Sequence, residues 1–370
     1  MTQILTLHAM APARVLRGPG AWTEAIAEIA ALVRRPLWLG RTTTCGPLGT
    51  AMAGDLEQAG LALTAAQLAF DCCDRDLERI AARARASGCD GVIAVGGGKV
   101  LDAGKLLAHR LDLACITVPT SAATCAGWTA LANVYSPEGA FSYDVPLRRC
   151  PELLVFDHQL VVQAPPRTLA SGIADAMAKW YEASVSSGAS SDGLIQQAVQ
   201  MARVLRDQLL LDTDAAMAAP GETAWVRVAE ACGLTAGVIG GLGGARCRTV
   251  AAHAVHNGLT QLPACHGQLH GEKVGFGILV QLRLEEVLGG SQLAAQARRQ
   301  LVPFFGRLGL PLTLADLGLG DASLSALQSV CEFACREGSD LHHLPFAVRP
   351  TELLAALVST TAGITSDATA

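Results

Sequence analysis

The stretch AVGGGKVLDAGK, residues 94–105, indicates how this chain folds. The apolar run Gly91–Val95 predicts a short buried parallel strand, and Val100–His109 continues at helical spacing. Three glycines in a row form the turn between them. They would let backbone N–H groups approach a pyrophosphate at the positive end of a helix. The turn matches neither GxGxxG nor Walker A, however, and any tight strand-to-helix turn favours glycine.

Short apolar strands and helical stretches alternate around this turn up to about residue 160. The expected strands are Pro36–Leu39, Gly91–Val95, Ala114–Val118 and Leu153–Phe156, and the expected helices include Trp22–Arg34, Gly46–Ala59 and Asp76–Ala86. Such alternation predicts a parallel, doubly wound α/β sheet.

After Pro165 and Pro166 the strand patterns disappear and helical patterns continue. They cover Thr168–Ser186, Gly193–Leu211, Glu222–Val238, Thr249–Thr260, Gly271–Leu288, Ser291–Leu308, Leu324–Cys335 and Pro350–Ala362. A length of 370 residues also favours two domains. We therefore expect an α/β dinucleotide-binding domain at 1–160 and an all-helical domain at 161–370.

The composition excludes several classes of protein. With 51% hydrophobic and 16% charged residues the chain has ample material for large cores, and its net charge of −5 argues against a nucleic-acid partner. The first twenty residues lack the basic flank and apolar core of a signal peptide. Every stretch of about 18 residues contains polar residues, so no membrane-spanning segment is expected. The twelve cysteines form no CxxC pair and indicate reduced, buried thiols of a cytoplasmic protein.

Histidines concentrate in one window of the predicted helical domain. Four of the nine lie there: His253, His256, His266 and His270. Neutral imidazole is a common ligand of zinc and iron ions. Upstream, SGIADAMAKWYEA adds the carboxylate of Asp175. Two histidines and one carboxylate leave coordination positions open, as a catalytic metal needs. His256 and His266 also fit the alternative of hydrogen-bonded core residues.

The whole chain resembles the group III, iron-containing alcohol dehydrogenase superfamily, most of all its glycerol dehydrogenase branch. The resemblance rests on GGGKVLDAGK, VPTSAATCAGWTALANVYS, SGIADAMAKWYEA, HAVHNGLT, HGEKVGFGILVQL and REGSDLHHLP. It implies a Rossmann-like parallel sheet followed by an all-α domain, the architecture also used by dehydroquinate synthase. It further implies hydride transfer between a nicotinamide and a CH–OH group of a small molecule, in a homo-oligomer.

The resemblance also implies roles for particular residues. Asp175, His253 and His270 would bind one divalent ion, for which we expect zinc rather than iron although these ligands suit both. His256, one turn after His253, would lie behind the ligands or face the substrate. We expect His256 and also Lys179, where the iron-dependent relatives carry a histidine ligand, to be catalytic residues. The residues expected to bind the dinucleotide are Gly96, Gly97, Gly98, Lys99 and Asp102, with Thr117, Thr120 and Thr124 on the nicotinamide side.

Two departures from the glycerol dehydrogenases favour an acid substrate. Cys125 occupies the position at which their loop carries an aspartate that binds the hydroxyl groups of the polyol. Arg246 and Arg248 precede the histidine window, and one of them could hold a carboxylate bidentately. Lys179, four residues after Asp175, is either its salt-bridge partner or a second anion anchor. The alternative is that each of these charges is solvated or structurally paired.

A third departure concerns the cofactor. Where the glycerol dehydrogenases place an acidic residue after the second strand, this chain has Arg41 followed by three threonines, Thr42–Thr44. An arginine with nearby hydroxyls suits a 2′-phosphate, which favours NADP(H) over NAD(H). The alternative is an exposed loop arginine with NAD bound.

Together these features predict a metal-dependent oxidoreductase that reduces a small 2-oxo acid to the 2-hydroxy acid with NAD(P)H. The alternative within the class is an NAD-dependent glycerol or vicinal-diol dehydrogenase. Two further alternatives are a lyase that cycles NAD internally, like dehydroquinate synthase, and a metal-binding homologue without activity.

Overall fold

The computed structural model describes residues 7–41 and 46–360. The chain forms two compact units that are not consecutive in sequence. The first comprises the residues up to 169 together with 211–244, and the second comprises 170–210 together with the residues from 245 onward. The segment 211–244 thus groups with the first unit, in contrast to the two consecutive ranges expected.

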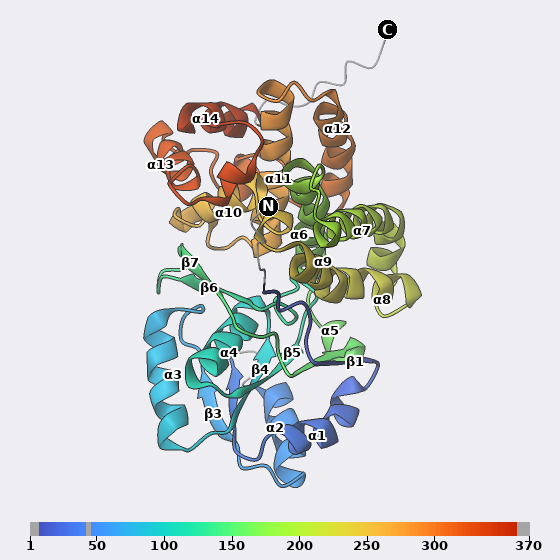
Figure 1. The fold of residues 1–370 in the computed structure, drawn as a ribbon, viewed down its shortest axis with the longest axis vertical. Coiled ribbons are helices and arrows are strands. Elements are labelled where there is room, and N and C mark those ends of the chain that lie inside the picture. Colours follow the sequence, from blue (N-terminus) through green and yellow to red (C-terminus); the bar gives the residue numbers. More distant parts are fainter. Residues whose placement is uncertain (1–6, 42–45, 361–370) are drawn as a thin grey trace. The chain divides into compact units, whose positions relative to one another are not determined.

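A six-stranded parallel sheet forms the centre of the first unit (Figure 1). The strand order is β1-β8-β5-β4-β2-β3. The strands are β1 (Arg14–Gly18), β2 (Pro36–Gly40), β3 (Thr64–Gln67), β4 (Gly91–Gly96), β5 (Ala114–Pro119) and β8 (Leu153–Asp157). This confirms the predicted parallel α/β sheet. A separate antiparallel hairpin, β6 (Leu131–Tyr135) and β7 (Phe141–Pro146), was not predicted.

Each face of the sheet carries its own hydrophobic core because side chains alternate along a strand. In β4, Val92 and Ala94 belong to the core beneath α3 (Asp74–Ala86) and α4 (Gly98–Leu111). Ile93 and Val95 belong to the core beneath α1 (Ala21–Leu32) and α2 (Pro47–Gln58). The apolar run that predicted this strand is therefore buried on both sides, as parallel strands in α/β sheets are.

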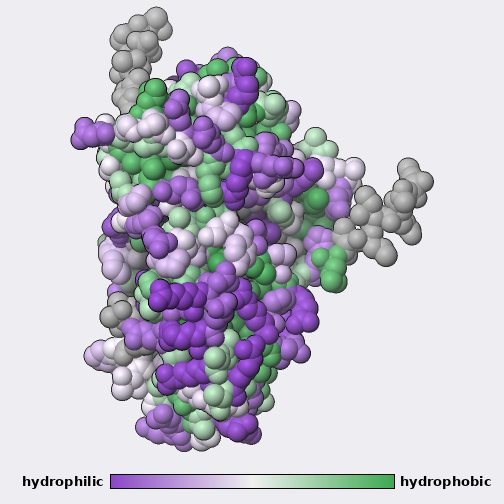
Figure 2. Space-filling view, turned by 90° about the vertical axis from the view of Figure 1, so that its left-hand side faces the viewer, coloured by the Kyte–Doolittle hydropathy of each residue, from purple (hydrophilic) through white to green (hydrophobic). Residues whose placement is uncertain are grey.

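Helix α3 separates its residues into a buried and a solvated face. Leu77, Ile80 and Ala84 are buried, whereas Arg79 and Arg83 are exposed. Figure 2, which views the side on which α3 lies in Figure 1, shows hydrophilic side chains gathered over the first unit. The surface mixes both signs of charge along α3, as an ordinary solvated helix face does.

Residues 211–244 of the first unit comprise the end of α7 (Gly193–Ala218), a turn, and one continuous helical run. This run consists of α8 (Thr223–Glu230), a π-helical turn at Ala231–Thr235 and α9 (Ala236–Gly243). By length and composition Thr223–Gly243 could cross a membrane, but 61% of its window is buried inside the protein, as in a core helix.

Glycines four residues apart let this run lie close to the rest of the first unit. A Cβ on Gly233 would come within 2.5 Å of the Phe156 ring, and one on Gly237 within 2.5 Å of the Trp128 side chain. Only a residue without a side chain allows these approaches.

The second unit is helical, as predicted. It contains α6 (Pro166–Ser187), whose residues from Ala170 onward belong here, and the first part of α7. The remaining helices are α10 (Ala251–Leu259), α11 (His270–Val287), α12 (Gln292–Arg307), α13 (Leu324–Ala334) and α14 (Pro350–Ser359). Val255, Phe276 and Val330 are fully buried in the core that joins α10, α11 and α13.

Candidate metal and cofactor sites

Three helices of the second unit each contribute one side chain to a compact cluster: Asp175 from α6, His253 from α10 and His270 from α11. The Asp175 Oδ1 atom lies 3.4 Å from His253 Nε2 and 3.5 Å from His270 Nε2. One ligand atom from each residue lies within 4.8 Å of the other two. The structure therefore brings together the three residues that the sequence singled out as ligands.

Two glycines of α11 explain why these helices approach so closely. A Cβ on Gly271 would come within 1.8 Å of the Ser171 carbonyl oxygen in α6, and one on Gly277 within 2.3 Å of the Ala252 carbonyl oxygen in α10. His270 is the first residue of α11, directly before the first of these contacts. The close packing at Gly271 therefore places the His270 ring beside α6.

The cluster fits a divalent ion. Asp175 Oδ1 is buried and has no hydrogen-bond partner among the residues that the structure describes. Burial alone would raise the pKa of Asp175, but the Lys179 ammonium and the two imidazoles hold it well below its usual range. Zinc bonds of about 2.0–2.2 Å in tetrahedral geometry separate ligand atoms by roughly 3.3–3.6 Å. The distances of 3.4 and 3.5 Å between Asp175 Oδ1 and the two Nε2 atoms match that separation.

The two expected catalytic residues both lie at the cluster. Lys179 Nζ is 3.8 Å from Asp175 Oδ1 and donates to the Arg248 carbonyl oxygen at 3.5 Å. The His256 ring lies 4.2 Å from the His270 ring, centroid to centroid. Burial, followed by the charges of neighbouring groups, lowers the pKa of His256 well below its usual value, so its ring is neutral.

His266 does not belong to the cluster. Its Nε2 atom lies 2.9 Å from the Thr260 carbonyl oxygen, a contact between the end of α10 and the loop that follows. Of the four histidines in the window, this one therefore fits the interpretation of a hydrogen-bonded structural residue.

The two candidate anion-binding arginines differ in environment. Arg246 is exposed, and its carbonyl oxygen accepts a hydrogen bond from Ser186 Oγ at 2.6 Å. Arg248 is partly buried, and its Nε atom has no partner within the described part of the chain. Since the Arg248 carbonyl also contacts Lys179, its backbone lies beside the cluster.

In the first unit, the three glycines lie where the pattern placed them, between β4 and α4. Gly97 precedes the first helical residue with extended backbone, and no side chain caps the helix there. A Cβ on Gly97 would meet nothing within 4 Å, whereas one on Gly98 would come within 3.0 Å of Thr124 Oγ1. The amino end of α4 thus offers backbone N–H groups to an anion.

The expected nicotinamide-side threonines fall into two groups. The Thr120 N–H donates to the Gly96 carbonyl oxygen at 3.1 Å, and Thr124 Oγ1 accepts from the Ala126 N–H at 3.1 Å. Both residues lie beside the glycine turn. Thr117 is fully buried, and its hydroxyl donates to the Gly127 carbonyl oxygen at 2.8 Å.

Asp102 is engaged within the fold. It forms an ion pair of 3.0 Å with Lys105 and accepts a hydrogen bond from the Asn133 N–H at 3.2 Å. Its carboxylate therefore ties α4 to strand β6.

Arg41, at the end of β2, shares a carboxylate with Lys99. Asp71 Oδ1 accepts from Arg41 at 2.7 Å, and Asp71 Oδ2 pairs with Lys99. Burial alone would raise the pKa of Asp71, but the two cations hold it below its usual range. Thr42–Thr44, expected to help Arg41 bind a phosphate, lie outside the described residues. Cys125 is buried, and its carbonyl oxygen accepts from the Trp128 N–H at 2.9 Å.

Sequence reasoning missed two carboxylates. Asp71 follows a short, polar strand that carried no pattern. Glu182 lies seven residues after Asp175, and this two-turn spacing on one helix is a signal that could have found it.

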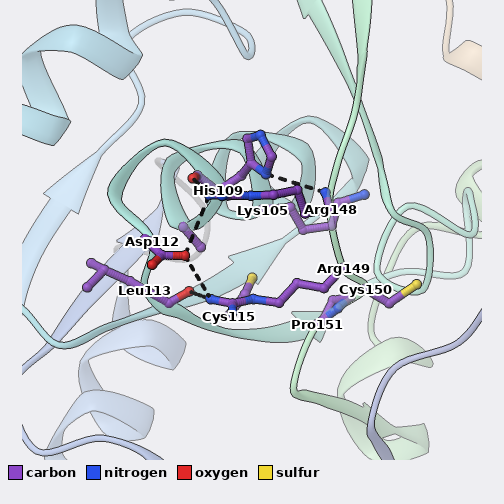
Figure 3. Close-up of a pocket in the computed structure, with 10 residues that line it drawn as sticks. Lys105, His109, Asp112, Leu113, Cys115, Arg148, Arg149, Cys150 and Pro151 are labelled. Carbon is purple, nitrogen blue, oxygen red and sulfur yellow. Dashed lines mark hydrogen bonds and ion pairs between the residues drawn. The ribbon is translucent and has the colours of Figure 1, made fainter. Parts of the chain in front are cut away.

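A hollow of about 190 Å³ lies at the carboxyl end of α4, the end opposite the glycine turn (Figure 3). Arg148 donates to the His109 carbonyl oxygen at 3.4 Å, and Arg149 donates to the Leu113 carbonyl oxygen at 2.9 Å. Asp112 and Glu152 also pair with these guanidinium groups. The arginines satisfy carbonyls at the negative end of the helix, which explains them structurally.

Comparison with known proteins gives consistent findings. Residues 12–158 match the family described as iron-containing alcohol dehydrogenase. An uncharacterized oxidoreductase of Synechocystis sp. is 60% identical over 301 residues, 81% of this chain and 78% of that protein. A glycerol dehydrogenase of Escherichia coli O6:H1 is 32% identical over 361 residues, 93% of this chain and 96% of that protein. Hydroxycarboxylate dehydrogenase A of Escherichia coli K12 is 36% identical over 294 residues, 77% of this chain and 78% of that protein. The crystal structure of a probable glycerol dehydrogenase from Sinorhizobium meliloti superimposes with a TM-score of 0.85 at 30% identity, covering 95% of this chain and 97% of that one.

Proposed function

The chain belongs to the iron-containing alcohol dehydrogenase family and is a dehydrogenase that acts on a CH–OH group. Within this family, we propose that it oxidises glycerol or another short vicinal diol with NAD. The observation that carries the proposal is the cluster of Asp175, His253 and His270, with its buried carboxylate oxygen that lacks a hydrogen-bond donor among the described residues. Glycerol dehydrogenases among the relatives support the choice of substrate. The sequence alone favoured reduction of a 2-oxo acid and gave the diol dehydrogenase as the alternative, so the order of the two candidates is now reversed.

We assign the metal to the second unit. A divalent ion held by Asp175, His253 and His270 supplies Lewis acidity, which lowers the pKa of a hydroxyl group or polarises a carbonyl group. Lys179 keeps the Asp175 carboxylate ionised and oriented. His256, neutral and packed against His270, is suited to accept a hydrogen bond from a substrate hydroxyl. The choice of zinc over iron stays a prediction, because the donor set suits both.

We assign the dinucleotide to the glycine turn of the first unit. Backbone N–H groups at Gly97 and Gly98 would bind the pyrophosphate, and Thr120 and Thr124 would contact the nicotinamide side. For Asp102 and Thr117 the structure gives other partners, so we assign them to holding the cofactor site together rather than to direct contact.

Reduction of a small 2-oxo acid is the second candidate function. The buried Arg248 Nε atom, for which the described residues supply no acceptor, favours it because a substrate carboxylate would provide one. Cys125 in place of an aspartate and the similarity to hydroxycarboxylate dehydrogenase A point the same way. The expected NADP(H) preference and the roles of Arg41 and Arg246 belong to this second candidate.

Steady-state turnover of the metal-loaded protein tests the two candidates. NAD and NADP are each offered with glycerol, and NADH and NADPH are each offered with 2-oxobutyrate. We expect the highest kcat/KM with NAD and glycerol. A higher kcat/KM with 2-oxobutyrate and NADPH would reverse the order of the candidates, and absence of turnover with both substrates would contradict both. Cytoplasmic location and assembly into a homo-oligomer stay predictions.

A further inference from the structure

Glu182 lies fully buried beside the candidate metal cluster but is not one of its ligands. Its side chain extends from α6 toward the start of α10 and has no exposed surface. One oxygen, Oε2, lies 2.7 Å from His253 Nδ1. The other, Oε1, accepts hydrogen bonds from the backbone N–H groups of Val250 at 2.7 Å and His253 at 3.0 Å.

The first consequence concerns the helix that carries His253. The first N–H groups of a helix have no partner within it. Helix α10 begins after Val250, which has no capping side chain of its own. Glu182 supplies the missing acceptor from a neighbouring helix, and Gln281 Oε1 accepts from the Ala252 N–H at 3.1 Å. The start of α10 is therefore held by two side chains from other helices.

The second consequence concerns the His253 ring. An ionised carboxylate only accepts hydrogen bonds, so the ring must present a proton to it from Nδ1. The lone pair available for a metal ion is then on Nε2, the atom that lies 3.4 Å from Asp175 Oδ1. A histidine ligand whose other ring nitrogen donates to a carboxylate is fixed in both tautomer and orientation.

We propose that Glu182 is a positioning residue: it holds His253 with its proton on Nδ1 and its Nε2 lone pair toward the ion. The proposal rests on the proposed metal site. Asp175 and Glu182 lie seven residues apart on α6, so one helix face supplies both a ligand and the group that orients a second ligand.

The substitution Glu182→Gln tests this role. Glutamine has nearly the same shape, and its carbonyl oxygen can still accept from the two backbone N–H groups. Its NH₂ group would then face His253 Nδ1, which must become an acceptor, so that the ring proton moves to Nε2 and blocks the metal. We expect the zinc affinity of the full chain, measured by competition with a chromophoric chelator, to fall about 10- to 100-fold. The melting temperature of the metal-free protein should change little.

Gln281→Met is the matched control. It removes an acceptor from the same helix end without touching the His253 ring. We expect a lower melting temperature with zinc affinity unchanged within about twofold. Equal loss of zinc affinity in both variants would mean that Glu182 acts only by capping the helix, which overturns the proposal.

Two further outcomes separate this proposal from the proposed function. Wild-type protein that binds no zinc would contradict the metal site itself, whereas a Glu182→Gln variant with wild-type zinc affinity would contradict only the role of Glu182. If the variant does not fold, nitrogen-15 NMR of the zinc-loaded wild type decides. The His253 signals should show the proton on Nδ1, and a proton on Nε2 would overturn the proposal.

Discussion

Asp175 is the side chain on which the candidate metal site depends most. A buried carboxylate oxygen without a hydrogen-bond donor is costly unless a cation provides the missing interaction. The Lys179 ammonium lies 3.8 Å from Asp175 Oδ1, which is longer than a direct hydrogen bond, and the His253 and His270 Nε2 atoms lie 3.4 and 3.5 Å from it. The site therefore has an incomplete set of interactions that a bound ion would complete.

We expect His270→Ala to remove most bound metal and to abolish turnover. The variant deletes one of the three ligands. His342→Ala serves as a control, because His342 is exposed and its Nε2 atom lies 3.1 Å from the Arg336 carbonyl oxygen. Metal content by elemental analysis is the measurement. Wild-type metal content in His270→Ala would contradict the ligand assignment.

The ion pair between Arg41 and Asp71 makes the cofactor preference testable. A 2′-phosphate would compete with Asp71 for the Arg41 guanidinium, so any NADP preference depends on the outcome of that competition. We expect Arg41→Asp to lower the ratio of kcat/KM for NADPH to that for NADH at least tenfold, because it places a second carboxylate beside Asp71. An unchanged ratio would show that Arg41 does not contact the phosphate.

The glycine spacing in the α8–α9 run allows a prediction about stability. Gly237→Val places methyl groups in the space held by the Trp128 side chain, and overpacking of this kind costs about 1–3 kcal/mol. Gly54→Ala in α2 is the control, since its Cβ would meet nothing within 4 Å. Urea denaturation should show a clear loss for the first variant and no loss for the second. Equal stability of both would mean that the run tolerates a wider separation.

Elements with strong patterns were predicted from the sequence, and those with weak patterns were not. The expected strand Gly91–Val95 and helix Gly46–Ala59 differ from β4 and α2 by about one residue at their ends. Strands β1 and β3 were missed because RVLRG and TAAQ at the sheet edges are short and carry few apolar residues. The π-helical turn inside 222–238 was also missed, because it keeps the apolar helical pattern.

The candidate site shows the same division. The histidine-rich window and the family resemblance predicted Asp175, His253 and His270 as ligands, because a metal cluster requires particular side-chain chemistry. Glu182 and Asp71 were missed because their importance comes from partners far along the chain, 71 residues away for Glu182 and His253. Contacts at that separation depend on how the helices pack, which a single sequence does not reveal.

The stability of the whole protein should depend on pH through Glu285 of α11. Burial, offset in part by the hydrogen bond from Gln281, raises the pKa of Glu285 from 4.5 to about 7. A raised carboxyl pKa means that the folded protein holds its proton more tightly than the unfolded chain does. The stabilisation is complete below about pH 4.5 and is lost as the pH rises through 7.

We expect Glu285→Gln, which cannot ionise, to weaken this dependence. Melting temperatures measured from pH 5 to pH 8 should show little difference from the wild type at the acidic end and a higher value for the variant at the alkaline end. Parallel curves for the two proteins would show that Glu285 does not titrate in this range.

Because each unit is built from two separate stretches of sequence, the order of synthesis limits when each unit can fold on the ribosome. Translation delivers the last sheet strand, β8, by residue 157, yet the first unit still lacks 211–244, which emerge only after residues that belong to its neighbour. Until then the Phe156 and Trp128 surfaces that later contact Gly233 and Gly237 have no cover. The Asp175 helix is likewise synthesised well before its two histidine partners. The first unit therefore cannot be completed before residue 244 has been synthesised, and the second unit, already begun at residue 170, cannot be completed before the helices that follow residue 245.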